Sequence, residues 1–261
     1  IVDGVLTNQG AIPSTNPVAM AFGGRALQPE ESTNFTIGTY FTAGPFDVTI
    51  DFFDIDVEDR LNLSSTVVLT DALVAQLVAD GVPGANDLAE FRFFTNDFDT
   101  NTSGIDLVAS ADTDWMGGTT TWSAAYNFTK TEVKSANPNT VDANRIRQIE
   151  EKTPDTRFTF SALHSTENLR VQARVNYYDE FFDDEAGGVF DDAVTVDLEA
   201  GFHINENSQV IVGGQNIFDE NGCETDKCGS FPSTDLGNEY SQFSPFGFNG
   251  AFWYARYQYT F

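Results

Sequence analysis

Apolar and polar residues alternate along several stretches of the chain, most clearly from Leu169 to Tyr177. The apolar register there is Leu169, Val171, Ala173, Val175 and Tyr177, and the polar register is Arg170, Gln172, Arg174 and Asn176. Successive side chains of a β-strand point to opposite faces, so a period of two predicts a strand with two different faces. Lipid outside a barrel and water inside it require this contrast, because an Arg on the lipid side costs about 2 to 4 kcal/mol.

Residues 247–261 contain a second strand of this kind. Its apolar register is Ala251, Trp253, Ala255, Tyr257, Tyr259 and Phe261. About ten residues of tilted strand cross a bilayer, and aromatic side chains gather at the membrane interfaces of transmembrane barrels. We therefore favour a membrane-crossing strand, although a soluble sandwich strand has the same alternation.

The pattern predicts nine antiparallel strands between residues 33 and 261, joined alternately by short and long connections. The short turns lie near residues 44, 117, 166 and 206, and the long connections near 59–90, 134–154, 180–190 and 219–247. Bacterial outer-membrane barrels have short periplasmic turns and long extracellular loops. The expected fold is therefore an all-β transmembrane antiparallel barrel. Single-chain bacterial barrels have an even strand number, so we expect nine strands to be one portion of a larger wall.

Two segments depart from the strand pattern. Residues 1–32 collect Gly, Pro, Asn and Ser without a sustained period, which predicts a loop. Leu69, Leu73, Leu77 and Val78 recur at helical spacing, with Thr70 placed to cap the start and Gly81 the end. We expect one short helical insert within a long extracellular loop.

The composition limits the choice of partners. The formal net charge is -27, from 40 acidic and 13 basic residues, which excludes nucleic acid as a partner because a phosphate backbone must be met by clustered Lys and Arg. No run approaches the roughly 18 apolar residues of a membrane helix. The first ten residues show no signal peptide, which for an outer-membrane protein implies maturation or truncation.

Cys223 and Cys228 are the two cysteines and fall in a segment rich in Gly, Asn and Asp. A structural zinc needs four N or S ligands, so a small loop disulfide in an oxidising compartment is the preferred interpretation over free thiols.

The histidines and the acidic stretches could bind metal ions, but each also has a simpler interpretation as solvated surface. His164 and His203, the two histidines, are predicted as solvated barrel-end residues, with shared metal ligation as the alternative. The acidic stretches Asp51–Asp59 and Asp179–Asp192 could bind Ca²⁺ through carboxylate oxygens, although neither has EF-hand spacing and solvated acidity is the simpler interpretation. No other cofactor is expected. The sequence has no G-x-S-x-G elbow, and we expect no catalysis.

Three sequence features resemble one family. They are the final run 240–261, the run VGGQNIFDE at 212–220, and a lead-in of Leu27, Pro29, Glu30 and Ser32 followed by a hairpin that ends in DFFDIDVEDR. Together they resemble the C-terminal end of TonB-dependent outer-membrane receptors. The resemblance implies that residues 33–261 are the C-terminal part of a 22-stranded barrel around a plug domain, and that residues 1–32 belong to an extracellular loop. Nothing in the chain resembles the plug or the TonB-contacting box.

The resemblance also implies site residues and partners. Phe261 with Trp253, Ala255, Tyr257 and Tyr259 would be the assembly signal that the barrel-assembly machinery reads. The extracellular rim would contact substrate, with Tyr240, Phe243, Phe246 and Phe248 as candidates, although these aromatics could instead pack the loop onto the barrel mouth. Arg170 and Arg174 would face the lumen and pair with acidic plug or neighbouring-strand residues.

The function implied is TonB-dependent uptake of a scarce nutrient across the outer membrane of a Gram-negative bacterium. Siderophore-bound iron, cobalamin and oligosaccharide remain open as ligands. The expected partners are the plug and earlier strands, TonB through the plug, and lipid and lipopolysaccharide around the wall. Two alternatives are a secreted or surface all-β module that binds calcium and a glycan, and a passive porin.

Overall fold

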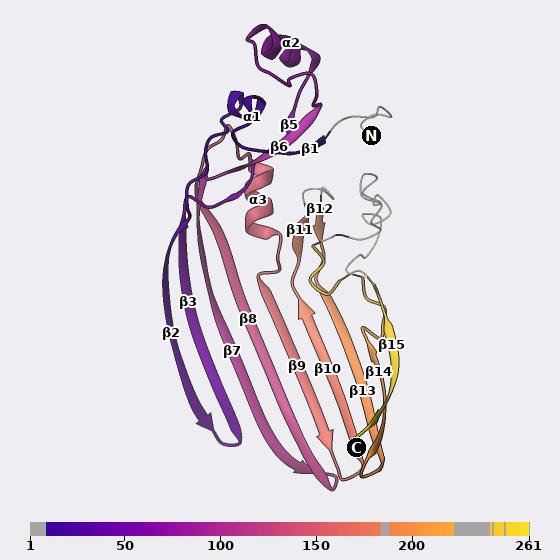
Figure 1. Ribbon diagram of the computed structural model, residues 1–261. Coiled ribbons are helices and arrows are strands. Elements are labelled where there is room, and N and C mark those ends of the chain that lie inside the picture. The colour runs from indigo at the N-terminus through magenta and orange to yellow at the C-terminus, as the bar shows by residue number, and fades with distance from the viewer. Residues whose placement is uncertain (1–8, 184–187, 222–240, 242, 248, 261) are drawn as a thin grey trace. The chain divides into compact units, whose positions relative to one another are not determined.

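The computed structural model describes residues 9–183, 188–221, 241, 243–247 and 249–260. Its main element is a nine-stranded sheet in which strands that follow one another in the chain are neighbours (Figure 1). The strands are β2 (Glu31–Ala43), β3 (Phe46–Glu58), β7 (Phe98–Trp115), β8 (Gly118–Ala136), β9 (Thr156–Ser165), β10 (Leu169–Tyr178), β13 (Ala193–Asn205), β14 (Ser208–Gln215) and β15 (Phe252–Tyr259). This confirms the predicted all-β fold and its nine strands.

The chain divides into two compact units. Unit 1 contains residues 1–34, 54–102 and 131–150, and unit 2 contains residues 35–53, 103–130 and 151–261. Strands β2, β3, β7 and β8 contribute residues to both units.

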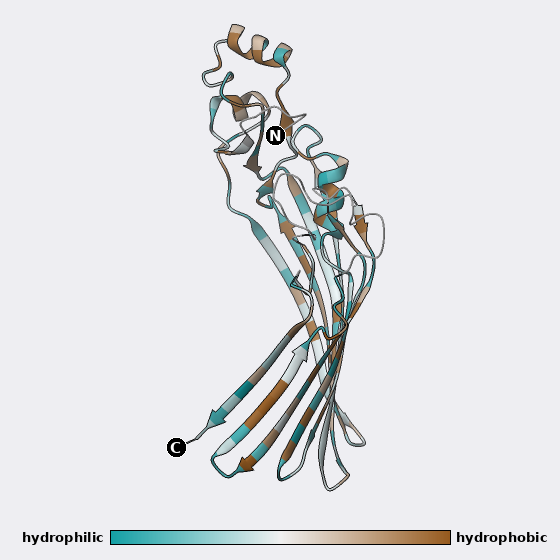
Figure 2. Cartoon of the chain, turned by 90° about the vertical axis from the view of Figure 1, so that its right-hand side faces the viewer, coloured by the Kyte–Doolittle hydropathy of each residue, from teal (hydrophilic) through white to brown (hydrophobic). Residues whose placement is uncertain are grey.

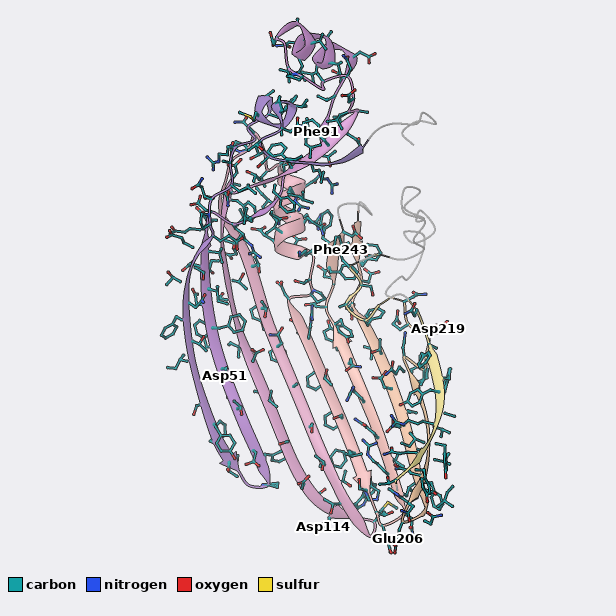
Figure 3. All side chains as sticks on the ribbon, in the orientation of Figure 1. Asp51, Phe91, Asp114, Glu206, Asp219 and Phe243 are labelled. Atoms are coloured by element: carbon teal, nitrogen blue, oxygen red, sulfur yellow. The ribbon has the colours of Figure 1, made fainter. Side chains whose placement is uncertain are left out.

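Unit 2 is an antiparallel wall with an unbroken register from β8 to β14 except for an irregularity near Asn205. Its connections at one end are short, and two of them place glycine at positive φ, with Gly44 at 64° and Gly117 at 77°. Figure 3 shows Asp114 and Glu206 together at this end of the wall, and Asp219 and Phe243 nearer the other. The turns predicted near residues 44, 117, 166 and 206 are therefore confirmed.

Unit 1 has its own small sheet and core. Its strands are β1 (Gln9–Ile12), β4 (Asn62–Leu63), β5 (Val67–Val68) and β6 (Glu90–Thr95), and β6 pairs with the other three. Helix α2 (Asp71–Ala79) begins after Thr70, whose Oγ1 accepts from Leu73 N, as the sequence predicts. The core holds Val18, Ala19, Leu69, Leu77, Ala85, Phe91 and Phe93.

Polar side chains fasten the junction between β6 and β7. Asn96 accepts a hydrogen bond from Gln28 N at 2.8 Å and donates to Asp59 O at 2.6 Å. Asp97 forms an ion pair with Arg25 at 2.9 Å. Nearby, Glu30 accepts a hydrogen bond from Leu61 N. These contacts connect residues distant in sequence, so the segment expected as a loop is tied down at its C-terminal end.

The described part of the chain has three helices, where one helical insert was expected. Helix α1 (Pro17–Ala21) lies in the predicted loop 1–32, and α3 (Ala143–Glu151) lies in the predicted polar loop 135–153. Each has a side-chain cap, because Asn16 accepts from Val18 N and Asp142 accepts from Arg145 N. The helices escaped prediction because α1 is too short for a period and α3 has few apolar residues. None of these helices has the length and hydrophobicity needed to cross a membrane.

A further small hairpin occupies the predicted acidic loop between β10 and β13. Its strands are β11 (Phe181–Asp183) and β12 (Gly188–Phe190), whose end rings stack with Phe181 and Phe190 centroids 5.0 Å apart. The sequence analysis also divides the chain into an extracellular loop segment, residues 1–32, and a barrel part, residues 33–261. This division stays a prediction.

Replacing Phe91 with Ala is expected to loosen unit 1. Phe91 is 1% exposed and packs edge-on against Phe22, so Phe91→Ala leaves a cavity and costs about 3 to 5 kcal/mol of local stability. Limited proteolysis of the folded protein should cut unit 1 faster. Phe94→Ala is the matched control, because Phe94 lies on the same strand and is 48% exposed. Equal cutting of the two variants would contradict the assigned core.

Candidate functional site

The apolar registers of unit 2 are exposed and do not meet in a core. Trp253 is 65% exposed, Tyr257 62% and Leu169 39%. The register continues across the wall, since Val175 pairs with Phe160 on one side and with Val196 on the other. Figure 2 shows hydrophobic and hydrophilic residues alternating along these strands. A soluble sandwich would bury this face, whereas a membrane wall turns it toward lipid. We call it the outward face and the opposite one the lumenal face.

The lumenal face carries a hydrogen-bonded network centred on Glu199 of β13. Tyr254 of β15 donates to Glu199 Oε2 at 2.6 Å, and Arg170 of β10 donates to Glu199 Oε1 at 2.6 Å. Arg170 also contacts Gln172 Oε1 at 3.4 Å. Charge-assisted hydrogen bonds of this kind are the strong ones. One carboxylate therefore links three strands on the side away from lipid.

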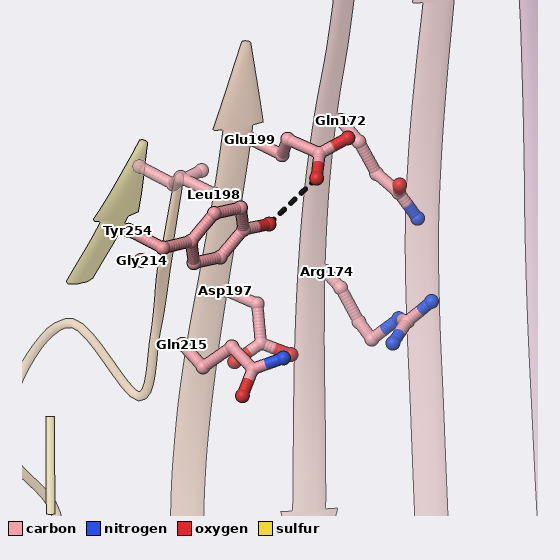
Figure 4. Close-up of a pocket in the computed structure, with 8 residues that line it drawn as sticks. All are labelled: Gln172, Arg174, Asp197, Leu198, Glu199, Gly214, Gln215 and Tyr254. Carbon is pink, nitrogen blue, oxygen red and sulfur yellow. Dashed lines mark hydrogen bonds between the residues drawn. The ribbon is translucent and has the colours of Figure 1, made fainter. Parts of the chain in front are cut away.

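A polar pocket of about 180 Å³ lies beside this network (Figure 4). It is lined by Gln172, Arg174, Asp197, Leu198, Glu199, Gly214, Gln215 and Tyr254. Asp197 accepts from Asn216 N at 2.9 Å and from Asn176 Nδ2 at 3.4 Å. Arg174 is directly opposite Asp197 in the strand register, but no hydrogen bond or ion pair of Arg174 occurs within the described ranges. The pocket thus contains two satisfied carboxylates and one unpaired guanidinium.

Acidic side chains are concentrated on β3 and β7, toward the other end of the strand order. Four aspartates of β3 and β7 in unit 2 accept hydrogen bonds from neutral groups on neighbouring strands. The pairs are Tyr40 with Asp47, Asn127 with Asp106, Thr121 with Asp112 and Thr119 with Asp114. Arginines instead occur on β9, β10 and β15, as Arg157, Arg170, Arg174 and Arg256. The polar face of unit 2 therefore changes sign along the strand order.

Two glycines of β14 make room for aromatic rings of β15, the last strand. Gly213 pairs with Tyr254 and Gly214 with Trp253. A Cβ on Gly213 would lie 2.6 Å from the Tyr254 ring, and one on Gly214 would lie 2.7 Å from the Trp253 ring. Both rings therefore lie across β14, Tyr254 on the lumenal face and Trp253 on the outward face. The glycine at 213 is what lets Tyr254 reach Glu199 two strands away.

The family follows from a comparison with known proteins. The model for the family described as "TonB dependent receptor-like, beta-barrel" matches residues 4–217. The chain belongs to the TonB-dependent receptors. Barrels of this family lie in the outer membrane of Gram-negative bacteria. The outward face of unit 2 therefore contacts the lipid of that membrane. No curated protein matches the chain.

Solved structures show the same fold in other receptors. The chain has a TM-score of 0.55 with the copper transporter OprC, at 14% identity over 90% of this chain and 32% of that one. The score is also 0.55 with the ferric-catecholate import receptor Fiu from E. coli K12, at 15% identity over 90% and 28%. It is 0.51 with the FrpB iron transporter (F3-3 variant) from Neisseria meningitidis, at 16% identity over 73% and 27%. The chain thus spans under a third of the length of each.

In this receptor chain, the NIFDE sequence forms a turn that ends β14. Asn216 and Asp219 have positive φ, 48° and 59°, a region that Asn and Asp tolerate better than most residues. Asn216 exchanges hydrogen bonds with the backbone of Glu220. Asp219 Oδ1 accepts from Ala251 N at 2.8 Å. The turn therefore holds the residues just before β15, although 32 residues separate Asp219 from Ala251.

The predicted rim aromatics are only partly described. Phe246 packs on Tyr178 with ring centroids 5.4 Å apart, as the loop-packing alternative expects. Phe243 is half-buried, and its N–H donates to Ser241 Oγ, which itself donates to the buried Asp183 at 2.6 Å. Tyr240 and Phe248 lie outside the described residues. Substrate contact by these four residues stays a prediction.

The rim also carries an acidic side chain with an altered titration. Burial raises the pKa of the Asp155 carboxyl above its ordinary value, and Asp179 and Glu151 raise it further while Lys130 lowers it. Asp155 directly precedes β9, and its raised pKa means that it takes up a proton at a higher pH than an ordinary aspartate does.

The assembly residues form the outward face of β15. Trp253, Ala255, Tyr257 and Tyr259 share one register, and Phe261 lies outside the described residues. Their reading by the assembly machinery stays a prediction.

The metal alternatives gain no support in the described part of the chain. His164 pairs with Val171 in the outward register, whereas His203 pairs with Gln209 in the lumenal one, so the two rings point to opposite faces. Asp51–Glu58 lies within β3, which is regular strand and not a flexible loop. No group of three or more His, Cys, Asp or Glu is placed to hold a metal among the described residues. Cys223 and Cys228 lie outside them, so the disulfide stays a prediction.

Arg170 and Arg174 lie on the polar face of β10, as the strand pattern predicts, but sequence reasoning missed the residues that organise this face. The sequence pattern assigned no role to Glu199, Gly213 or Gly214. The available signal was the pair Gly-Gly on one strand and Trp-Tyr on the next, which antiparallel pairing brings together.

Substituting Gly213 is expected to disturb the last strand. In Gly213→Ala the new methyl collides with the Tyr254 ring, and overpacking of this kind costs about 1 to 3 kcal/mol. The fraction of protein that resists unfolding by detergent without heating should fall. Gly188→Ala is the control, because a Cβ there meets nothing within 4 Å. If adding Tyr254→Ala does not restore part of the loss, the ring contact is not the cause.

Proposed function

We propose that this chain is the C-terminal part of the barrel wall of a receptor that takes up a scarce nutrient by TonB-dependent transport. The observation that carries the proposal is a wall with an exposed apolar face and a hydrogen-bonded polar face, in a chain whose residues 4–217 match the receptor barrel. The family is one of transporters, so we expect no enzymatic role.

The edges of the sheet support partners that complete the wall. Among the described strands, β2 and β15 each have a neighbour on one side only. In lipid every backbone N–H and C=O must be paired, and open sheet edges do not occur there. We therefore propose that earlier strands of the receptor pair with both edges and close the barrel around a plug domain.

The proposed mechanism assigns the chain a binding and guiding role. Ligand binds at the extracellular rim, and TonB acts on the plug to open the path through the lumen. The barrel-assembly machinery would insert the wall by its last strand, and lipid with lipopolysaccharide would surround the outward face. Calcium bound by the acidic segments would be a structural addition that this mechanism does not need.

The choice of ligand to test first is suggested by the solved structures that the chain resembles. The solved relatives named above include an iron transporter, a copper transporter and a ferric-catecholate receptor. Siderophore-bound iron is accordingly a ligand to test first, with cobalamin and an oligosaccharide as the other members of the set.

Uptake by cells carrying the complete receptor tests the proposal. Cells should accumulate one of a ferric siderophore, cobalamin or an oligosaccharide, and accumulation should stop when TonB is deleted or the proton gradient is collapsed. Accumulation that continues without TonB would identify a passive porin instead. A chain that purifies as a folded protein without detergent would favour the soluble calcium- and glycan-binding module.

A rim variant tests the substrate contacts separately. Phe243→Ala in the complete receptor should weaken ligand binding by about tenfold, as the loss of an aromatic contact residue does. Phe218→Ala is the control, because Phe218 is 73% exposed on the turn after β14. Unchanged affinity in Phe243→Ala, measured by calorimetry in detergent, would remove Phe243 from the candidate contacts.

A further inference from the structure

We propose that the lumenal pocket between β10, β13, β14 and β15 is a carboxylate-binding subsite centred on Arg174. The inference goes beyond nutrient uptake and depends on the proposed function only in taking the polar face as lumenal. Figure 4 shows Arg174, Gln172 and Gln215 around the pocket, with Tyr254 bonded to Glu199 above Asp197.

The carboxylates of the pocket are already occupied. Both oxygens of Glu199 accept short hydrogen bonds, from Arg170 and from Tyr254. Both oxygens of Asp197 also accept, from Asn216 N and from Asn176 Nδ2. Asp197 is therefore held by its own neighbours, which explains how Arg174 can face it without forming an ion pair. A cationic ligand would have to displace bonds that exist.

The unused groups of the pocket are hydrogen-bond donors. Arg174 has no hydrogen-bond partner in the described part of the chain, and its guanidinium presents a planar fork that suits two carboxylate oxygens. Gln172 accepts from Arg170 through Oε1, so its NH₂ group remains available. Gln215 adds a second amide to the lining. These free donors suit a ligand that accepts hydrogen bonds.

The charges of the pocket depend on two arginines outside its lining. The lining itself carries one positive side chain, Arg174, and two negative ones, Asp197 and Glu199, which gives -1. Arg170 is bonded to Glu199, and Arg256 lies on the same face of β15 as Tyr254. With these two arginines the sum is +1, which one bound carboxylate would neutralise.

The size of the pocket also fits. Its volume of about 180 Å³ is many times the roughly 10 to 15 Å³ that a single water molecule needs, which leaves room for a carboxylate and a short carbon stem. The space exists because β14 presents glycine beside the pocket, at Gly214 in the lining and at Gly213 under the Tyr254 ring. The carboxylate can belong to an Asp or Glu of the plug domain or to a small acid that enters the lumen.

Acetate binding by the complete receptor in detergent tests the subsite. Ligand-observed NMR at constant ionic strength compares the native protein with Arg174→Gln, Arg174→Lys and Arg157→Gln. Arg157 is the matched control, since it lies on the lumenal face of β9 outside the pocket lining. For a soluble acid, the native protein and Arg157→Gln bind acetate, Arg174→Gln binds it roughly ten- to a hundredfold more weakly, and Arg174→Lys falls between.

If the plug supplies the carboxylate, the native receptor does not bind acetate because the subsite is filled. Arg174→Gln then lowers the thermal unfolding midpoint more than Arg157→Gln, and neutralising one Asp or Glu of the plug gives a loss that does not add to that of Arg174→Gln. Acetate binding that is unchanged by Arg174→Gln overturns the proposal. So does a native receptor that ignores acetate while Arg174→Gln and Arg157→Gln unfold at the same temperature. Uptake by cells enters neither measurement, so failure here is distinct from failure of the transport proposal.

Discussion

The wall depends on one constraint, which is that its backbone polar groups must be paired while its side chains divide between lipid and water. Nothing in the hydrocarbon can accept a hydrogen bond, so only a closed set of paired strands is stable there. The register from β8 to β15 meets this demand, and the same register sends every second side chain outward. Fold and surface chemistry are therefore consequences of one pairing pattern.

The lumenal face uses the freedom that remains. Side chains there need not be apolar, and they form bonds across strands, such as those from Arg170 and Tyr254 to Glu199. These bonds stiffen the wall without any contribution from a hydrophobic core. The carboxylates of β13 accept hydrogen bonds from neighbouring strands, whereas Arg174 has no such partner among the described residues. This part of the face therefore offers free hydrogen-bond donors to a partner or ligand.

The sequence predicts the strands well because a two-sided solvent leaves a strong period-two signal in each of them. The same logic placed Arg170 and Arg174 on the polar face. It could not find helix α3, whose fold depends on the Asp142 cap and on burial of Ile149. Nor could it find the pocket, because the partners of Glu199 and Asp197 lie on other strands and only three-dimensional register brings them together.

The paired glycines of β14 have a consequence for how the final strand finds its place. A slip by one residue would exchange its faces and send Arg256 into lipid, so the alternation itself forbids odd displacements. A slip by two residues keeps the faces correct, and alternation offers no protection against it. Gly213 and Gly214 do, because only one alignment sets both Tyr254 and Trp253 over a residue without a side chain. The two glycines thus fix the register of β15 against slips by an even number of residues, which the alternation of apolar and polar residues permits.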